Sequence, residues 1–162
     1  MFKSLQSCRF ERHQPTKRGI ASVEEKTIAL EEQFTGLLWA IVAPLKEYQL
    51  GWHINKVLGF ELKKADDMEL IHKKRHKTSV YSCYKYESEL DKWLVYVVSN
   101  KNSGEFLVPE VRQADYFLII RGEISVQREE ELFVKLRSIP VIQLVVKMNF
   151  DHLKSKANLM ID

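Results

Sequence analysis

The sequence lacks the features of disulfide-stabilised and membrane-spanning proteins. Its 162 residues include only two cysteines, Cys8 and Cys83, which are too few for a disulfide framework, and we recognise no secretory signal. The longest apolar runs cover residues 37–43, 93–98 and 141–146, far short of the roughly 20 residues that a membrane-spanning helix requires. We therefore expect a cytoplasmic protein that keeps its thiols reduced and does not enter a membrane.

Signatures of catalysis and of cofactor binding are also missing. The sequence contains no GxGxxG, P-loop, GxSxG, HExxH or CxxC motif. His72 and His76 have the spacing that binds zinc on a helix, but they lie in a lysine-rich stretch that we interpret as strand and loop. His53 has no nucleophile or carboxylate near it in the sequence, so we interpret it as a hydrogen-bonded histidine of the core. We expect no metal site and no cofactor, and these absences favour a non-catalytic protein over an enzyme.

The charge is unevenly distributed. Residues 1–23 contain five basic residues and one acidic residue, a net charge of +4. The rest of the chain contains 20 basic and 21 acidic residues, a net charge of −1. A nearly neutral body argues against a dedicated nucleic-acid-binding domain on charge grounds.

The basic segment at residues 1–23 has no sustained helical or strand periodicity and contains Pro15 and Gly19. We expect a disordered tail here, followed by a single domain at residues 24–162. Three interpretations of the tail stay open: an organellar transit peptide, a basic arm for an anionic partner, or sequence upstream of the natural start codon. We favour a dispensable tail.

The body of the chain shows alternating strand and helix patterns. We expect an α+β fold, with about seven or eight mostly antiparallel strands in a twisted sheet and three helices packed against it. Predicted strands cover residues 26–32, 36–43, 60–63, 68–72, 79–86, 92–99, 106–108, 116–121 and 141–148. Predicted helices cover residues 44–58, 125–138 and 150–160.

Several local features refine this prediction. The uncharged run at residues 37–42 indicates a strand inside the sheet, and NKNSG at residues 100–104 is the clearest hairpin turn. The strand–helix–strand unit at residues 116–148 is compatible with a parallel crossover. The first predicted helix carries Pro44 in its first turn and ends at Gly59. Apolar residues occupy much of its circumference, which predicts a well-buried helix: Leu45, Tyr48, Trp52, Ile54, Val57 and Leu58.

The densest cluster of charge is the segment IHKKRHK at residues 71–77. Its four strongest cations are candidate phosphate contacts: Lys73, Lys74, Arg75 and Lys77. The alternative is a solvated loop tip between two strands, where charge also discourages edge pairing. We favour the loop tip, because Asp66, Asp67 and Glu69 lie just before the segment and dilute its field.

The most suggestive stretch is LVPEVRQADYFL at residues 107–118. Pro109 and Glu110 suit the start of a single turn, and Asp115 can accept hydrogen bonds from local backbone N–H groups. Tyr116 can bury its ring while its hydroxyl makes one hydrogen bond. These structural roles account for the stretch completely. The alternative is that Glu110 and Asp115 form an acid–base pair, although nothing nearby supplies a nucleophile.

This stretch resembles the motif of the IPExxxVDY family of Bacteroidetes proteins, with Val in place of the first Ile and Ala in place of the later Val. The six motif positions are Val108, Pro109, Glu110, Ala114, Asp115 and Tyr116. Other similar features are YQL at residues 48–50 with Asn55, the pair Asp66-Asp67, and VSNK at residues 98–101. The resemblance covers roughly residues 26–160. It implies a bacterial cytoplasm, which counts against a transit peptide, and it carries no assigned activity, cofactor or catalytic residue.

Three functions therefore remain as expectations. The leading one is a non-catalytic protein-binding or adaptor domain whose partner is another protein, with aromatic residues as interface anchors. The second is a nucleic-acid or ribosome-associated protein that uses the tail and the 71–77 loop. The third is a hydrolase that uses Glu110, Asp115 and a histidine brought near by folding. A buried motif at residues 108–116 would indicate a structural role, and an exposed one a functional surface.

Overall fold

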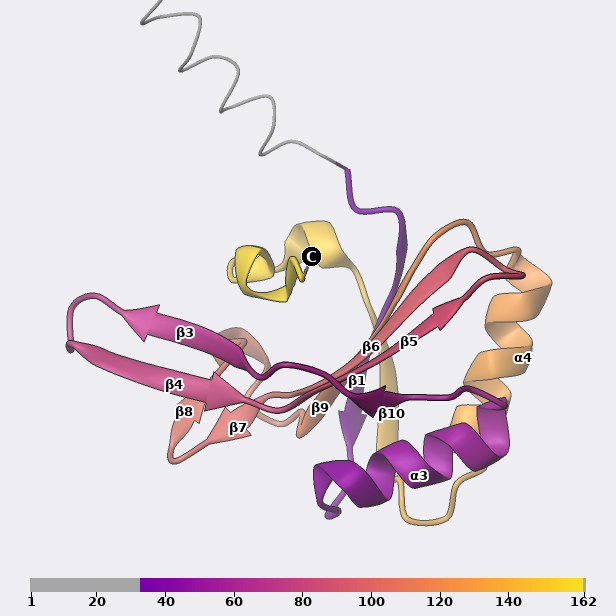
Figure 1. Cartoon of the computed structure of the whole chain (residues 1–162), viewed down its shortest axis with the longest axis horizontal. Coiled ribbons are helices and arrows are strands. Elements are labelled where there is room, and N and C mark those ends of the chain that lie inside the picture. Colours follow the sequence, from indigo (N-terminus) through magenta and orange to yellow (C-terminus); the bar gives the residue numbers. More distant parts are fainter. Residues whose placement is uncertain (1–32, 162) are drawn as a thin grey trace, which may run out of the picture. The chain divides into compact units, whose positions relative to one another are not determined.

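A six-stranded antiparallel sheet forms the centre of the computed structural model, which describes residues 33–161 (Figure 1). The strand order is β10-β1-β9-β6-β5-β2. These strands are β1 Gly36–Val42, β2 Lys63–Lys64, β5 Cys83–Ser88, β6 Trp93–Ser99, β9 Tyr116–Arg121 and β10 Leu144–Met148. Two small hairpins accompany the sheet: β3 Met68–His72 with β4 Lys77–Tyr81, and β7 Lys101–Asn102 with β8 Glu105–Phe106.

Two α-helices occur among the described residues, α3 Glu47–Leu58 and α4 Val126–Arg137. Three short 3-10 helices complete the structure: Pro109–Val111, Phe150–His152 and Lys156–Leu159. The α+β class and the mostly antiparallel sheet are thus confirmed. The predicted tail at residues 1–23 and the predicted strand at residues 26–32 lie outside the described part of the chain. No helix in that described part is long and apolar enough to cross a membrane.

Strand β1 lies between β10 and β9 and is antiparallel to both, which confirms its predicted interior position. It follows that β9 and β10 run in the same direction with β1 between them, and α4 connects them as the predicted crossover. Alternate residues of β1 enter different cores. Trp39 and Ile41 pack against α3 and α4, whereas Leu38 and Ala40 belong to a second cluster that includes Phe150. Because both faces are covered, the strand is apolar throughout.

The predicted numbers of strands and helices are wrong, for local reasons. Ten short strands occur within residues 33–161, where eight were predicted. The strand predicted at residues 79–86 is broken at Ser82 into the hairpin strand β4 and the sheet strand β5, and β7 forms within the turn predicted at residues 100–104. The backbone N–H of Ser82 donates to Oγ of Ser99 (3.0 Å). The helix predicted at residues 150–160 is replaced by two 3-10 turns, since Leu153 has an extended backbone between them.

Helix α3 also differs from its prediction. It begins at Glu47, not at Pro44, and its first turn is closed by the backbone N–H of Lys46, which donates to the Gln49 side chain (3.1 Å). Its predicted end is confirmed, because Gly59 has the left-handed φ of 73° that glycine adopts easily. The other predicted turn is also confirmed: NKNSG forms the β7–β8 hairpin.

Candidate functional sites

The motif loop, which we define as residues 108–116, is anchored in the core at three positions. Val108 and Ala114 are fully buried and Tyr116 is 6% exposed, whereas Pro109 and Glu110 face solvent. The buried members belong to the two cores of the sheet. The motif therefore has mixed exposure, and its buried half is structural.

Asn100 ties the motif loop together from inside. Its side chain is completely buried and donates from Nδ2 to the carbonyls of Val111 (2.9 Å) and Ala114 (3.0 Å). Its Oδ1 accepts from the backbone N–H of Val108 (2.8 Å), and its own N–H donates to the carbonyl of Asp115 (2.8 Å). One amide thus satisfies the backbone N–H of Val108 and the carbonyl of Ala114, and it adds a second donor to the carbonyl of Val111, which also accepts from the backbone N–H of Ala114 (3.2 Å). This role of Asn100 was not predicted, because a single Asn after a strand carries no local pattern that indicates burial.

The last two motif residues hold the chain before α3. One oxygen of Asp115, Oδ2, accepts from the backbone N–H of Ala43 (2.9 Å), and Oδ1 pairs with Nζ of Lys101 (2.6 Å). The hydroxyl of Tyr116 donates to the carbonyl of Leu45. Burial raises the pKa of Tyr116 to about 12. The predicted single hydrogen bond of Tyr116 is present. Asp115 does accept from a backbone N–H, but the donor lies 72 residues away in the sequence and is not local as predicted.

Glu110 fastens the C-terminal segment to the loop. Its carboxylate accepts from the backbone N–H of Ser155 (2.7 Å) and from the Ser155 hydroxyl (2.9 Å). Burial acts to raise the pKa of Glu110, but these hydrogen bonds outweigh it and hold the pKa below its ordinary value. Asn158 adds a second tie by donating to the carbonyl of Leu107 (2.8 Å).

The two carboxylates of the motif have separate surroundings. Asp115 lines a polar hollow of about 410 Å³ together with Glu47, Ser82 and Lys101, among others. Neither Glu110 nor any histidine is among the described residues that line it. Glu110 is instead engaged by Ser155. The structure therefore does not bring together the acid–base pair and histidine that a hydrolase of the predicted kind needs.

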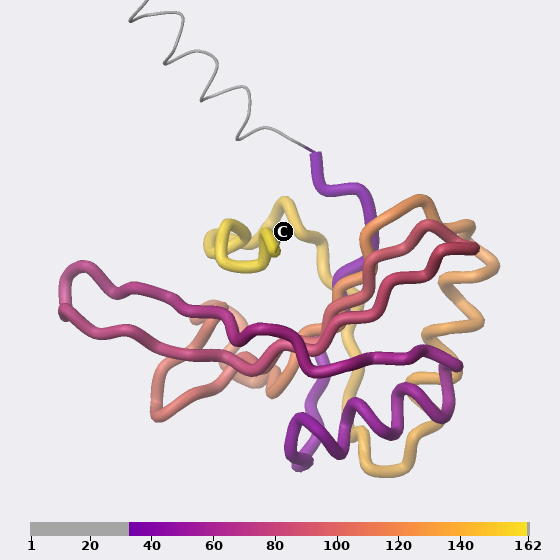
Figure 2. The backbone as a smooth tube through the Cα atoms, in the orientation of Figure 1, coloured from indigo at the N-terminus to yellow at the C-terminus, as the bar shows by residue number. Residues whose placement is uncertain are grey.

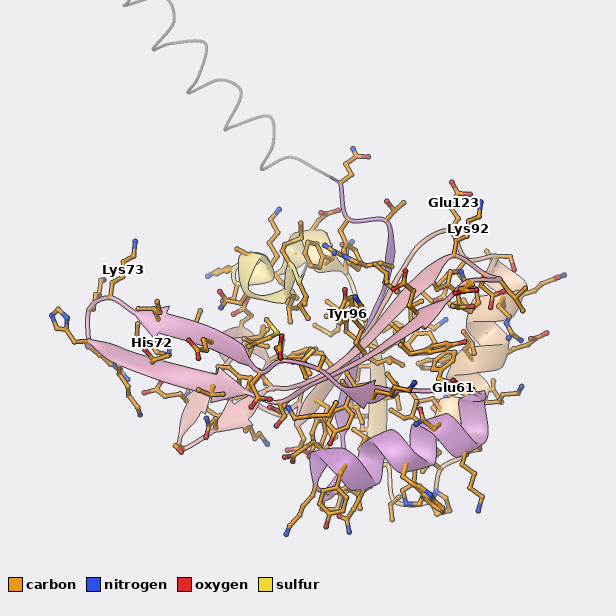
Figure 3. All side chains as sticks on the ribbon, in the orientation of Figure 1. Glu61, His72, Lys73, Lys92, Tyr96 and Glu123 are labelled. Carbon is orange, nitrogen blue, oxygen red and sulfur yellow. The ribbon has the colours of Figure 1, made fainter. Side chains whose placement is uncertain are left out.

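The basic segment at residues 71–77 forms the tip of the β3–β4 hairpin, which extends away from the main sheet (Figure 2). Figure 3 shows Lys73 projecting from this tip. Arg75 pairs with Glu105 of the neighbouring hairpin (2.8 Å), and Lys77 lies 3.9 Å from the same carboxylate. His72 Nε2 lies 3.1 Å from Oγ of the buried Ser79. The predicted loop tip between two strands is confirmed.

Beside this tip lies a hollow of about 650 Å³, which we call the hairpin hollow. One wall comes from residues 71–75 of the hairpin, and the other comes from residues 104–106 with Pro109 and Arg112. The guanidinium of Arg112 lies 5.7 Å from the ring centroid of Phe106. That Arg112 and Phe106 join the basic segment could not be predicted, because some 30 residues separate the two walls in the sequence.

The outer surface of α3 carries the largest departure from the sequence prediction. Tyr48 is 56% exposed and Trp52 is 58% exposed, although both were predicted to be buried. The buried stripe consists of Leu50, Ile54 and Leu58, four residues apart. An open hollow of about 450 Å³ lies over the exposed stripe. Its lining defines the α3 aromatic face: Leu45, Tyr48, Gln49, Trp52 and His53.

Trp52 is held in place by its neighbours on the helix. The ring of His53 packs edge-on against it with 4.9 Å between centroids, and Nζ of Lys56 lies 4.9 Å from its centroid. His53 is half-buried, so its predicted place in the core is wrong.

The described residues contain no arrangement for thiol or metal chemistry. Cys83 is a free thiol in the core, and its burial raises its pKa to about 11. Among residues 33–161, no group of three or more His, Cys, Asp or Glu residues is arranged to hold a metal ion.

In comparisons with known proteins, no protein-family profile, curated protein or solved structure matches the chain. The resemblance to the IPExxxVDY proteins therefore stays a prediction. Any functional proposal depends on the surfaces described above.

Proposed function

We propose that the chain is a non-catalytic protein-binding domain of the bacterial cytoplasm, an adaptor that holds another protein against the α3 aromatic face. The observation that carries this proposal is the exposure of Tyr48 and Trp52, side by side one helical turn apart. Tryptophan and tyrosine are the residues that most often dominate binding energy at protein interfaces.

A structural role for these two side chains is a weaker explanation. Helix α3 is already anchored by Leu50, Ile54 and Leu58, which are at most 6% exposed. More than half of the Trp52 surface remains in water, so the ring contributes little to the core of this domain. Contacts with His53 and Lys56 restrict the ring, which reduces the entropy lost when a partner binds.

The charges around the face indicate the chemistry of the partner. Lys46 and Lys56 are exposed next to the aromatic pair. We expect the partner to insert an apolar side chain into the hollow over α3 and to place a carboxylate near one of these lysines. Such rim charges chiefly steer the encounter, whereas the apolar contact supplies affinity.

Photo-cross-linking in a native bacterial lysate tests this function. A benzophenone amino acid replaces Tyr48, keeping an aromatic group on the face, and in a matched control it replaces Leu90, which is 97% exposed in the β5–β6 turn. We expect a discrete protein adduct from position 48 that is absent at position 90 and disappears when Trp52→Ala is added. Adducts that do not differ between the two positions, or that persist with Trp52→Ala, contradict the proposal.

The affinity for the cross-linked protein, once purified, can be read from Trp52 itself. The other two tryptophans, Trp39 and Trp93, are at most 5% exposed, so acrylamide quenches mainly Trp52 in the domain. Binding at the α3 aromatic face should protect this fluorescence from quenching. Trp52→Ala lacks this reporter, so its affinity and that of Leu90→Ala are measured by isothermal titration calorimetry. We expect Trp52→Ala to weaken binding by about 2 kcal/mol or more, and Leu90→Ala to leave it within about 0.5 kcal/mol. Binding without protection would place the interface elsewhere.

A further inference from the structure

We propose that the hairpin hollow binds single-stranded nucleic acid, with phosphates held by Lys73 and Lys74 and one base stacked on Arg112, which lies over Phe106. This inference concerns a surface separate from the α3 aromatic face and does not depend on the function proposed for that face.

The charge of the hollow favours an anionic ligand. Four cations line it, Lys73, Lys74, Arg75 and Arg112, against the single carboxylate of Glu105. Glu105 is already engaged by Arg75 (2.8 Å). Within residues 33–161, neither Lys73 nor Lys74 forms an ion pair with a carboxylate, and both are exposed. Two adjacent unpaired cations of this kind bind phosphates by releasing condensed counterions.

The floor of the hollow favours a planar, partly apolar group over a bare anion. Phe106 is half-buried, and the guanidinium of Arg112 lies over its ring. Pro109 and the exposed side chain of Ile71 add apolar surface. Unpaired bases stack on guanidinium planes and aromatic rings through their faces, which leaves their phosphates and base edges free for other contacts. A platform with cations at its rim therefore matches a nucleotide within a single strand.

The geometry also distinguishes a single strand from a duplex. The hollow has a volume of about 650 Å³, which lies in the range of pockets that enclose a small organic group. A base paired within a duplex has both of its faces covered by its neighbours, so it cannot reach the Arg112 platform without leaving the stack. The Arg75–Glu105 pair links the two hairpins and keeps the two walls of the hollow in place.

Fluorescence anisotropy with the full chain tests this site. The probes are fluorescein-labelled oligouridylate and oligothymidylate of about ten nucleotides, which cover the usual length of one such site. We expect Lys73→Ala/Lys74→Ala to weaken binding about tenfold and to reduce the slope of log K against log salt by about 1.4, the value for two lost phosphate contacts. Binding of one probe and not the other would assign RNA or DNA as the ligand, and both results support the site.

The control removes the same charge elsewhere. Lys92→Ala/Lys135→Ala takes two exposed lysines from the β5–β6 turn and α4; Figure 3 shows Lys92 at the opposite end of the sheet from Lys73. We expect this variant to bind within about twofold of the natural sequence. If it binds as weakly as Lys73→Ala/Lys74→Ala, the oligonucleotide is attracted by the overall charge of the protein. If neither variant differs from the natural sequence, the oligonucleotide binds outside the hollow. Either result contradicts the proposal.

A third variant separates stacking from charge. Arg112→Lys keeps the positive charge but removes the plane, so we expect about fivefold weaker binding with an unchanged salt slope. An unchanged affinity overturns the stacking role of Arg112. Phosphatidylserine vesicles and polyglutamate serve as competitors; if either displaces the oligonucleotide at an equal concentration of charge, the hollow recognises negative charge alone and the proposal fails. Identical circular dichroism and thermal unfolding for all variants exclude misfolding as a cause.

Discussion

The motif loop and the basic hairpin are close to each other in the fold, yet their polar side chains are used in opposite ways. At the motif loop, Asp115 and the neighbouring Asn100 direct polar atoms to backbone groups inside the domain. In the hairpin, Lys73 and Lys74 direct theirs to solvent. A sequence motif and a charge cluster can look equally functional, and only the partners of their side chains separate a structural role from an available surface.

Pro109 and Arg112 connect the two regions. They belong to the turn inside the motif loop but line the hairpin hollow. The buried half of the loop can thus be understood as the support that holds its exposed half against the hairpin. If so, substitutions in the loop should lower stability strongly, whereas substitutions in the hairpin should leave stability nearly unchanged.

The largest expected effect is that of Asn100→Ala. The substitution leaves the buried N–H of Val108 and the buried carbonyl of Ala114 without partners and removes one of the two donors to the Val111 carbonyl, so we expect the free energy of unfolding to fall by about 3 kcal/mol. Urea unfolding followed by tryptophan fluorescence measures this loss. The matched control is Gln113→Ala, an exposed amide in the same loop, which should change stability by less than about 0.5 kcal/mol. Equal losses of stability for the two variants would mean that Asn100 does not hold the motif loop together.

A smaller loss is expected for Tyr116→Phe. Removing the hydroxyl leaves the carbonyl of Leu45 without this donor, at a cost of about 1 kcal/mol near neutral pH. Because the pKa of Tyr116 is about 12 in the fold and about 10 in the unfolded chain, the unfolded state loses its proton first as the pH rises. The stability contributed by Tyr116 is therefore complete below about pH 10 and is lost towards pH 12.

Unfolding curves between pH 8 and 12 should show this behaviour directly: the stability difference between the natural sequence and Tyr116→Phe narrows as the pH rises through about 10 to 12. Tyr48→Phe, at an exposed position, is the control and should follow the natural sequence throughout. A difference that stays constant over this range would mean that the Tyr116 hydroxyl is not protected by the fold.

Glu110→Gln should have a still smaller effect, about 0.5 kcal/mol, because Glu110 is exposed and its bonds to Ser155 are partly screened by water. The pKa of Glu110 is lowered in the fold, so its contribution is present above the ordinary value and lost as the pH falls through the lowered one. Thermal unfolding of the two proteins should thus converge in acid. Glu123→Gln, exposed in the turn before α4, should match the natural sequence at every pH.

Runs of apolar residues made the interior of the sheet predictable. Strand β1 could be located and placed inside the sheet because its uncharged run has alternate residues in two cores. Helix α3 was misjudged because it carries two apolar stripes, aliphatic at Leu50 and Ile54 and aromatic at Tyr48 and Trp52, and periodicity cannot say which stripe meets the sheet.

The sites were less predictable than the strands. The roles of Asp115 and Tyr116 in hydrogen bonding followed from their side-chain chemistry. The position of Arg112 beside the basic hairpin did not, because it depends on contacts between two hairpins distant in the sequence: the Arg75–Glu105 pair, and the hydrogen bond from Asn102 to the carbonyl of Val80. Contacts of this kind depend on the topology of the chain and leave no local pattern in the sequence.

The smallest stability change, and the sharpest contrast with Asn100→Ala, is expected for Lys73→Ala/Lys74→Ala. Both lysines are exposed at the hairpin tip, where a side chain contributes little to folding, so unfolding free energy should change by less than about 0.5 kcal/mol. Lys101→Ala, which breaks the pair with Asp115 in the motif loop, should cost more, up to about 1 kcal/mol. If the double variant proved the more damaging in urea unfolding, the hairpin charges would belong to the structural framework, and their availability to a ligand would have to be abandoned.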